Sequence, residues 1–136
     1  MDVIYELTEE HIQQLHALYQ HEWWTVGRTL EQTQQCVDGS QICLGLIDNH
    51  SQLQGFARVI TDYTFKAFIF DLIIAKKHRH AGLGRRLLEL IKSHDQLKHV
   101  HHIELYCKPD VETFYAQHGF TSDIEGIKLL RYLNSK

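Results

Sequence analysis

The first forty residues contain two stretches in which apolar side chains recur at helical spacing. In residues 12–19 these side chains fall on one face of a helix that Thr8 can cap. Thr29 and Gln32 have the spacing of a capping box, which predicts a second helix through about Val37. The chain is therefore expected to begin with two short amphipathic helices.

After residue 40 the apolar positions follow the spacing of strands, and after Gly82 they return to helical spacing. Short polar links between the central strands predict an antiparallel meander. The longer crossover through the helix after Gly82 predicts that strand 102–107 runs parallel to strand 66–75. In chain order we expect strands at 3–7, 42–47, 53–60, 66–75, 102–107, Phe120 and 127–133, and further helices at 83–91 and 111–118.

These elements predict one α+β domain that covers residues 1–136. Its mixed central sheet is expected to hold about six to seven strands, antiparallel except for one parallel pair, with about four flanking helices. A chain of 136 residues, 43% of them hydrophobic, is long enough to bury one core.

Charge and composition narrow the classes of partner. A net charge of -3 argues against general affinity for nucleic acid, and no apolar stretch approaches the roughly 20 residues that span a bilayer. The three cysteines are widely spaced, which favours reduced thiols and a cytoplasmic location over a disulfide framework. The eleven histidines lack Cys or acidic partners at zinc-site spacing, so we expect no metal site.

Residues 68–91 contain the two most informative features of the sequence. An apolar strand leads into a basic loop with Gly82 and Gly84, and a helix follows at once. The first-turn N–H groups of a helix have no intrahelical partner, so this loop predicts a phosphate-binding site. Asp71 interrupts the strand, and alternation places it on the face of Ile69 and Ile73, opposite Phe70 and Leu72.

Two motifs lie in and after the glycine loop. The loop Arg79-His80-Ala81-Gly82-Leu83-Gly84 fits the pattern Q/R-x-x-G-x-G/A. About thirty residues later, the segment Phe114 to Phe120 fits the pattern F-Y-x-x-x-G-F. Both motifs resemble those of the GCN5-related N-acetyltransferase (GNAT) superfamily. Together with the order of elements, this resemblance covers essentially the whole chain. It implies a GNAT fold and acetyl-CoA as the acetyl donor.

The resemblance also implies roles for individual residues. The pyrophosphate of acetyl-CoA would bind the loop and first helical turn, from Arg79 to Arg85, and the pantetheine arm would pair with the strand at Leu72, Ile73 and Ile74. A backbone N–H near Leu72 or Ile73 would stabilise the oxyanion. Tyr115 occupies the position of the general acid, and Phe114 beside it is a candidate cofactor contact. Lys108 stands where the family often has Asn, and it could reach a phosphate.

Asp71 and the acceptor side of the site leave alternatives open. Burial would raise the pKa of Asp71 toward a range useful for a base, so Asp71 could bind or deprotonate the acceptor amine, or it could be structural. In the family, the segment between the first two helices forms a wall of the acceptor site. It contains Trp23, Trp24 and Arg28, which with Tyr63 are our candidates for substrate binding.

The expected activity is transfer of an acetyl group from acetyl-CoA to a primary amine by direct attack in a ternary complex. The alternative is a module of the same fold that binds acyl-CoA without catalysis. The expected partners are acetyl-CoA and an amine acceptor, with a homodimer possible, as is common in the family, and with no nucleic acid or membrane.

Overall fold

The computed structural model of the chain describes residues 1–134. The chain divides into two compact units, Met1–Glu104 and Leu105–Lys136. The first unit contains every strand among the described residues, together with three of the α-helices. The second unit contains one helix and an extended segment.

The sheet of the first unit has five strands in the order β1-β2-β3-β4-β5. The strands β1, β2, β3 and β4 pair antiparallel, and β4 pairs parallel with β5, as predicted. The parallel ladder is short, because it begins where Lys66 pairs with His102 and ends at Phe68 and Glu104. The strand bounds are β1 Asp2–Ile4, β2 Ile42–Ile47, β3 Leu53–Thr61, β4 Lys66–Ile74 and β5 His102–Glu104.

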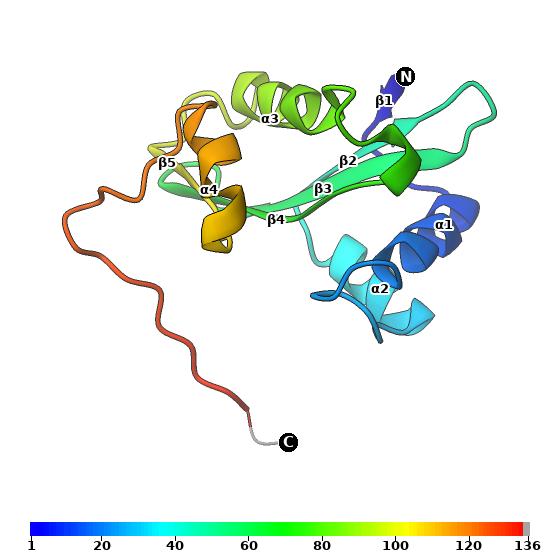
Figure 1. Cartoon of the computed structure of the whole chain (residues 1–136), viewed down its shortest axis with the longest axis horizontal. Helices are drawn as coiled ribbons and strands as arrows, with labels where there is room; N and C mark the ends of the chain where they lie inside the picture. The colour runs from blue at the N-terminus through cyan, green and yellow to red at the C-terminus, as the bar shows by residue number, and fades with distance from the viewer. Residues whose placement is uncertain (135–136) are drawn as a thin grey trace. The chain divides into compact units, whose positions relative to one another are not determined.

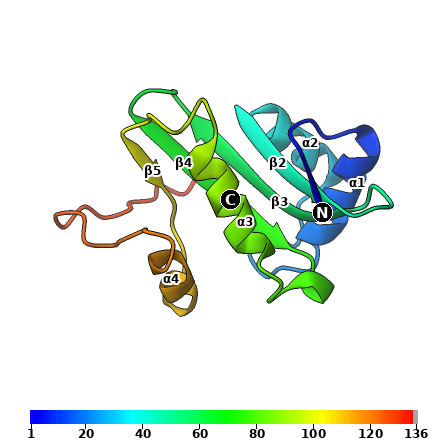
Figure 2. The ribbon, with the colours of Figure 1, turned by 90° about the horizontal axis from the view of Figure 1, so that it is seen from above.

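Helices cover both faces of this sheet. The helices α1 (Glu9–Tyr19) and α2 (Leu30–Asp38) lie on one face, and α3 (Leu83–Ser93) lies on the other (Figure 1). Seen from above, α3 crosses β3 and β4 (Figure 2). A core cluster of Leu15, Tyr19, Phe56 and other buried residues fills the space between α1 and the sheet.

Local sequence signals fix the ends of the first two helices. Thr8 and Thr29 both accept a hydrogen bond from the backbone of the third helical residue, and both helices have a complete capping box. The box at Thr29 uses Gln32, as predicted, whereas the box at Thr8 uses the ring of His11. No helix among residues 1–134 is long and apolar enough to cross a membrane.

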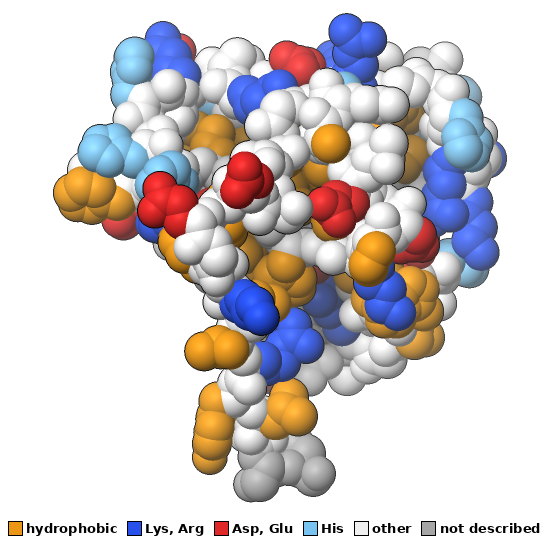
Figure 3. Space-filling view, turned by 60° about the vertical axis from the view of Figure 1, so that its left-hand side comes forward, with side chains coloured by type: hydrophobic (Ala, Val, Ile, Leu, Met, Phe, Trp, Pro, Cys, Tyr) orange, Lys and Arg blue, Asp and Glu red, His pale blue; other side chains and the backbone are white. Residues whose placement is uncertain are grey.

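The sheet has fewer strands than predicted. The second unit contains helix α4 (Pro109–Ala116), but no strand occurs among residues 105–134, so the strands expected at Phe120 and 127–133 are wrong. A strand exists only where its backbone pairs with a neighbour, and residues 105–134 form no ladder with any described strand. Several hydrophobic side chains of this segment are exposed, among them Ile127, Leu130 and Tyr132. Figure 3 shows hydrophobic side chains standing out from the surface near the end of the described chain.

Candidate active site

A β-bulge interrupts the pairing of β3 and β4 at Asp71. Phe56 pairs with Ile73 and Arg58 pairs with Phe70, so one residue of β3 faces two residues of β4. Asp71 has a φ of 55°, in the left-handed region that favours glycine and tolerates Asp and Asn. The bulge therefore changes the direction of the Asp71 side chain within the strand.

This bulge explains why the face predicted for Asp71 is right only in part. Asp71 lies on the face of Ile73, as predicted, because Tyr19 shares a core cluster with Ile73 and donates a hydrogen bond to Asp71, but it also shares the face of Phe70. The guanidinium of Arg58 lies 4.9 Å from the centroid of the Phe70 ring, and its Nε donates to Asp71 Oδ2 at 2.7 Å. Asp71 and Phe70 therefore share the face that carries α1 and α2. Strict alternation would have placed them on opposite faces, but an extra residue in one strand breaks the period of two.

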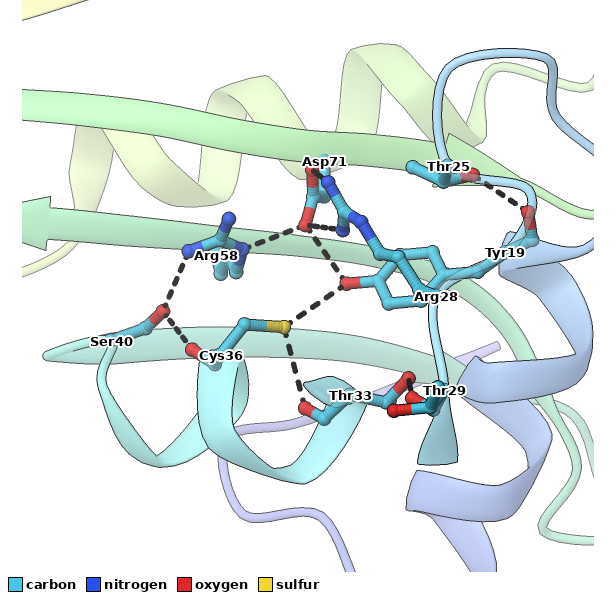
Figure 4. A network of polar contacts seen from close by, with 9 residues as sticks. All are labelled: Tyr19, Thr25, Arg28, Thr29, Thr33, Cys36, Ser40, Arg58 and Asp71. Atoms are coloured by element: carbon cyan, nitrogen blue, oxygen red, sulfur yellow. Dashed lines mark hydrogen bonds and ion pairs between the residues drawn. The ribbon is translucent and has the colours of Figure 1, made fainter. Parts of the chain in front are cut away.

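The carboxylate of Asp71 is the centre of a buried polar cluster (Figure 4). Arg28 binds it with both terminal nitrogens, at 2.6 Å to Oδ2 and 3.2 Å to Oδ1. The Tyr19 hydroxyl donates to Oδ2 at 2.9 Å, and Arg58 Nε donates to the same oxygen. The side chain of Asp71 is 5% exposed, so its predicted burial is confirmed.

The predicted direction of the pKa shift of Asp71 is wrong. Burial by itself raises the pKa of this carboxyl, but hydrogen bonds and charges from Arg28 and Arg58 outweigh burial and lower it below its usual value. Asp71 is therefore ionised at neutral pH. The same cluster raises the pKa of Tyr19 far above its usual value, through burial and the neighbouring Asp71 charge, so Tyr19 stays protonated.

Of the residues predicted for substrate binding, the structure brings only Arg28 to Asp71. The guanidinium of Arg28 also lies over the Tyr19 ring, 4.5 Å from its centroid. Trp23 and Trp24 lie in the segment between α1 and α2 with much of their surface exposed. Tyr63 lies in the turn between β3 and β4, and the stretch of β4 from Lys66 to Asp71 separates this turn from the cluster by about 17 Å.

Sequence reasoning missed two members of the cluster, Tyr19 and Arg58. Tyr19 completes the apolar stripe of α1, so it was counted only as a core residue. Arg58 is the only charged residue within β3, and this was the available signal. A second charge inside an apolar strand, next in sequence to the strand that holds Asp71, predicts that the two form an ion pair.

The glycine loop leads directly into α3. A short 3-10 helix (Lys76–His78) follows β4, and the left-handed residues His80 (φ 67°) and Gly82 (φ 81°) then turn the chain. Gly82 is the N-cap of α3. The first backbone hydrogen bond of this helix runs from Arg86 N–H to Gly82 O at 3.0 Å. The N–H groups of Leu83, Gly84 and Arg85 are those that a helix leaves without an intrahelical partner.

The strand β4 has an open edge beside this loop. Its ladder with β5 stops at Phe68, so among the described strands of the first unit the stretch from Ile69 to Ile74 pairs only with β3. Leu72 and Ile74 are half-buried, and Ile73 is buried in the core. The stretch predicted to bind the pantetheine arm can therefore pair with a further extended chain on this edge.

The segment Phe114 to Phe120 in the second unit forms a helix C-terminus of the Schellman type. Gly119 has a φ of 92°, Gly119 N–H donates to Ala116 O, and Phe120 N–H donates to Tyr115 O at 3.2 Å. The Tyr115 and Phe120 rings meet edge-on at 6.1 Å, and Phe114 meets Tyr115 at 5.1 Å. The motif thus holds the Tyr115 ring between two aromatic neighbours.

Tyr115 and Lys108 differ strongly in their surroundings. Burial, with a smaller effect from Cys107, raises the pKa of Tyr115 to about 12. Tyr115 is therefore protonated throughout the physiological range, as a proton donor must be. Lys108 is the exposed N-cap of α4.

Among residues 1–134, no group of three or more His, Cys, Asp or Glu side chains could hold a metal ion.

Comparison with known proteins finds relatives among the N-acetyltransferases. A relative named as an uncharacterized N-acetyltransferase, ycf52 of Porphyra purpurea, is 36% identical over 107 residues, which cover 76% of this chain and 61% of that protein. The chain thus spans about three fifths of that relative's length. A Xanthomonas campestris protein assigned to the GNAT family superposes with a TM-score of 0.80 at 25% identity, covering 98% of this chain and 94% of the other.

A further structural neighbour was solved with coenzyme A. It is an aminoglycoside 6'-N-acetyltransferase, and its TM-score is 0.60 at 18% identity over 68% of this chain and 53% of that one. At this identity the likeness concerns the fold alone. The acetyltransferase (GNAT) domain matches residues 38–122, which include the glycine loop, the bulge at Asp71 and Tyr115. The chain therefore belongs to the GNAT acetyltransferase family.

Proposed function

We propose that this protein transfers the acetyl group of acetyl-CoA to a primary amine in a ternary complex. The observation that carries the proposal is the junction of the open β4 edge with the N-terminus of α3 across Gly82. An extended amide-bearing chain fits the first, and a pyrophosphate fits the second. Acetyl-CoA contains both groups in one molecule.

The chain's own residues would bind acetyl-CoA as follows. The N–H groups of the first turn of α3 receive the pyrophosphate, and the backbone of Leu72 to Ile74 pairs with the pantetheine arm. Arg85 and Lys108 are exposed and carry positive charge for the phosphates. Phe114 supplies an apolar contact next to Tyr115.

In the proposed reaction the neutral amine nitrogen attacks the thioester carbonyl, a C–N bond forms, and the C–S bond breaks. A backbone N–H near Leu72 or Ile73, at the bulge, donates to the oxyanion. Tyr115 donates its proton to the departing thiolate; the proton that the amine nitrogen loses passes to solvent, and the Tyr115 phenolate takes up a proton from solvent. Asp71 is ionised and held by two arginines, which makes it a weak proton acceptor, so we assign it to positioning Arg28 in the acceptor wall.

A panel of primary amines with detection of released CoA thiol tests this proposal. We expect acetyl-CoA-dependent thiol release with at least one class of small amine, amino acid, polyamine, or peptide N-terminus or lysine. Saturable acetyl-CoA binding with no transfer across the panel would instead assign the chain to acyl-CoA-binding modules. Absence of saturable binding would contradict both assignments.

Location and assembly stay predictions. Cys36, Cys43 and Cys107 are all free, which fits the reducing compartment expected for a cytoplasmic protein. Light scattering during gel filtration distinguishes a monomer from a homodimer.

Replacing Gly82 with alanine is expected to weaken acetyl-CoA binding about tenfold. An added Cβ meets no atom within 4 Å, so its cost comes from the positive φ and amounts to about 1–2 kcal/mol. Relief of that strain would rotate the N–H groups that face the pyrophosphate. Isothermal titration calorimetry measures the change in Kd.

Gly126→Ala is the matched control for this substitution. Gly126 has a φ of 77° and open space around its Cβ position, but it lies outside the glycine loop. We expect a similar loss of stability with an unchanged Kd. Equal effects of the two variants on Kd would show that the geometry of the loop at Gly82 has no special part in binding.

A further inference from the structure

Arg79, the first residue of the glycine loop, is bound by two groups of the first unit. Its Nε donates to the backbone oxygen of Ile74 at 3.3 Å, and its guanidinium forms an ion pair with Glu22. The side chain of Glu22 is 15% exposed and that of Arg79 is 40% exposed, so the pair lies at the surface with Glu22 on its inner side.

These two contacts occupy atoms that the proposed cofactor path requires. Ile74 O lies on the β4 edge where the pantetheine arm would pair, and Arg79 is one of the cations expected near the pyrophosphate. A guanidinium bound to Ile74 O blocks that acceptor for an incoming amide. The side chain of Arg79 therefore has to leave Ile74 O before an extended chain can pair along the whole edge.

Glu22 connects the same contact to the acceptor side of the site. It lies between α1 and α2, immediately before Trp23 and Trp24. Its backbone oxygen accepts hydrogen bonds from Thr25 N–H at 3.2 Å and Val26 N–H at 2.9 Å, so Glu22 belongs to the turn that organises this segment. Movement of Glu22 would thus move the residues expected to line the acceptor site.

We propose that Glu22 is a positioning residue that holds Arg79 on Ile74 O until acetyl-CoA binds, and so couples cofactor binding to the segment with Trp23 and Trp24. The proposal rests on the proposed function. A pyrophosphate carries more negative charge than one carboxylate and offers Arg79 several oxygens. It therefore competes for Arg79, because the Arg79 side of the ion pair is 40% exposed and water screens its attraction to Glu22. Release of Arg79 frees both Ile74 O and Glu22.

The tryptophans make this coupling measurable, because the chain has only two and both lie within two residues of Glu22. We expect titration of the wild-type protein with acetyl-CoA to give a saturable change in tryptophan fluorescence. In Glu22→Gln the ion pair is already broken, so the change should shrink to less than half. The Kd for acetyl-CoA should fall about two- to fivefold, because the cofactor no longer competes with Glu22.

Glu6→Gln is the control, since it makes the same change of charge at an exposed residue of the first unit. We expect its Kd and fluorescence change to equal those of the wild type. A double-mutant cycle with Arg79→Gln isolates the pair, because Glu22→Gln should have no further effect on Kd once Arg79 is removed. Thermal unfolding of each variant confirms that it is folded.

The outcomes separate the two proposals. An unchanged or raised Kd in Glu22→Gln, or a full fluorescence change, would overturn the role of Glu22 and leave the acetyltransferase proposal standing. If Glu22→Gln changed the Kd for acetyl-CoA equally in the wild type and in Arg79→Gln, the role of Glu22 would also be overturned. Failure of the wild type to bind acetyl-CoA would overturn the proposed function, and this inference with it.

Discussion

Tyr115→Phe is expected to lower kcat for acetyl transfer by about 100-fold or more while Kd for acetyl-CoA stays within about twofold. The substitution removes only the hydroxyl, so the ring can keep its edge-on contacts with Phe114 and Phe120. Without a proton donor the departing sulfur must leave as a thiolate. Steady-state thiol release gives kcat, and calorimetry with acetyl-CoA gives Kd.

Tyr132→Phe is the matched control in the same unit, because the Tyr132 side chain is 87% exposed. We expect it to change neither constant. Since the pKa of Tyr115 is about 12, kcat of the wild type should show no loss from deprotonation of Tyr115 below about pH 11. Wild-type turnover in Tyr115→Phe would remove this residue from the mechanism.

The sequence predicted best those features that depend on a few neighbouring residues. The two N-caps at Thr8 and Thr29 are confirmed, since a capping hydrogen bond joins residues only three apart. The parallel pairing of β4 with β5 is also confirmed, because a crossover that contains a helix leaves room for it. Both inferences required no knowledge of tertiary packing.

The C-terminal segment shows where such reasoning fails. Residues 127–133 have the apolar content of a strand, yet Ile127, Leu130 and Leu133 are exposed and the segment is unpaired. Composition reports only that side chains would suit a half-buried sheet surface. Whether a partner strand is present depends on tertiary structure, so the count of six to seven strands was too high.

The site was predicted in part for the same reason. Burial of Asp71 followed from its apolar neighbours and is confirmed, but the direction of its pKa shift depends on which cations reach it. Arg28 comes from a loop 43 positions away and Arg58 from the adjacent strand. The bulge that brings Asp71 to the same face as Arg58 depends on strand register, which alternation alone does not reveal.

Asp71→Asn is expected to lower the free energy of unfolding by about 3 kcal/mol at neutral pH. Asparagine keeps the size of the side chain and tolerates the left-handed backbone at this position, so the substitution removes mainly the charge. Two guanidinium groups, one of them largely buried, then lose the anion that compensates them. Urea unfolding followed by circular dichroism measures the difference.

Two controls separate the charge from its surroundings. Asp123→Asn makes the same change at an exposed residue of the second unit and should alter stability by less than about 0.5 kcal/mol. Tyr19→Phe removes one hydrogen bond to Asp71 but leaves both ion pairs, so its loss should be smaller, about 1–2 kcal/mol. A larger loss of stability in Tyr19→Phe than in Asp71→Asn would contradict the inference that the ion pairs contribute most of the stability of this cluster.

The pH dependence of the stability difference between the wild type and Asp71→Asn identifies the origin of that difference. The folded pKa of Asp71 lies below that of an unfolded aspartate, about 3.9, so ionised Asp71 stabilises the fold fully above that value. Its contribution is lost as pH falls through the folded pKa. The wild type should therefore exceed Asp71→Asn in stability by a constant amount from pH 7 to about 5, and the gap should close as pH falls further. A gap that closed between pH 7 and 5 would instead indicate a raised pKa, and would return Asp71 to consideration as a general base.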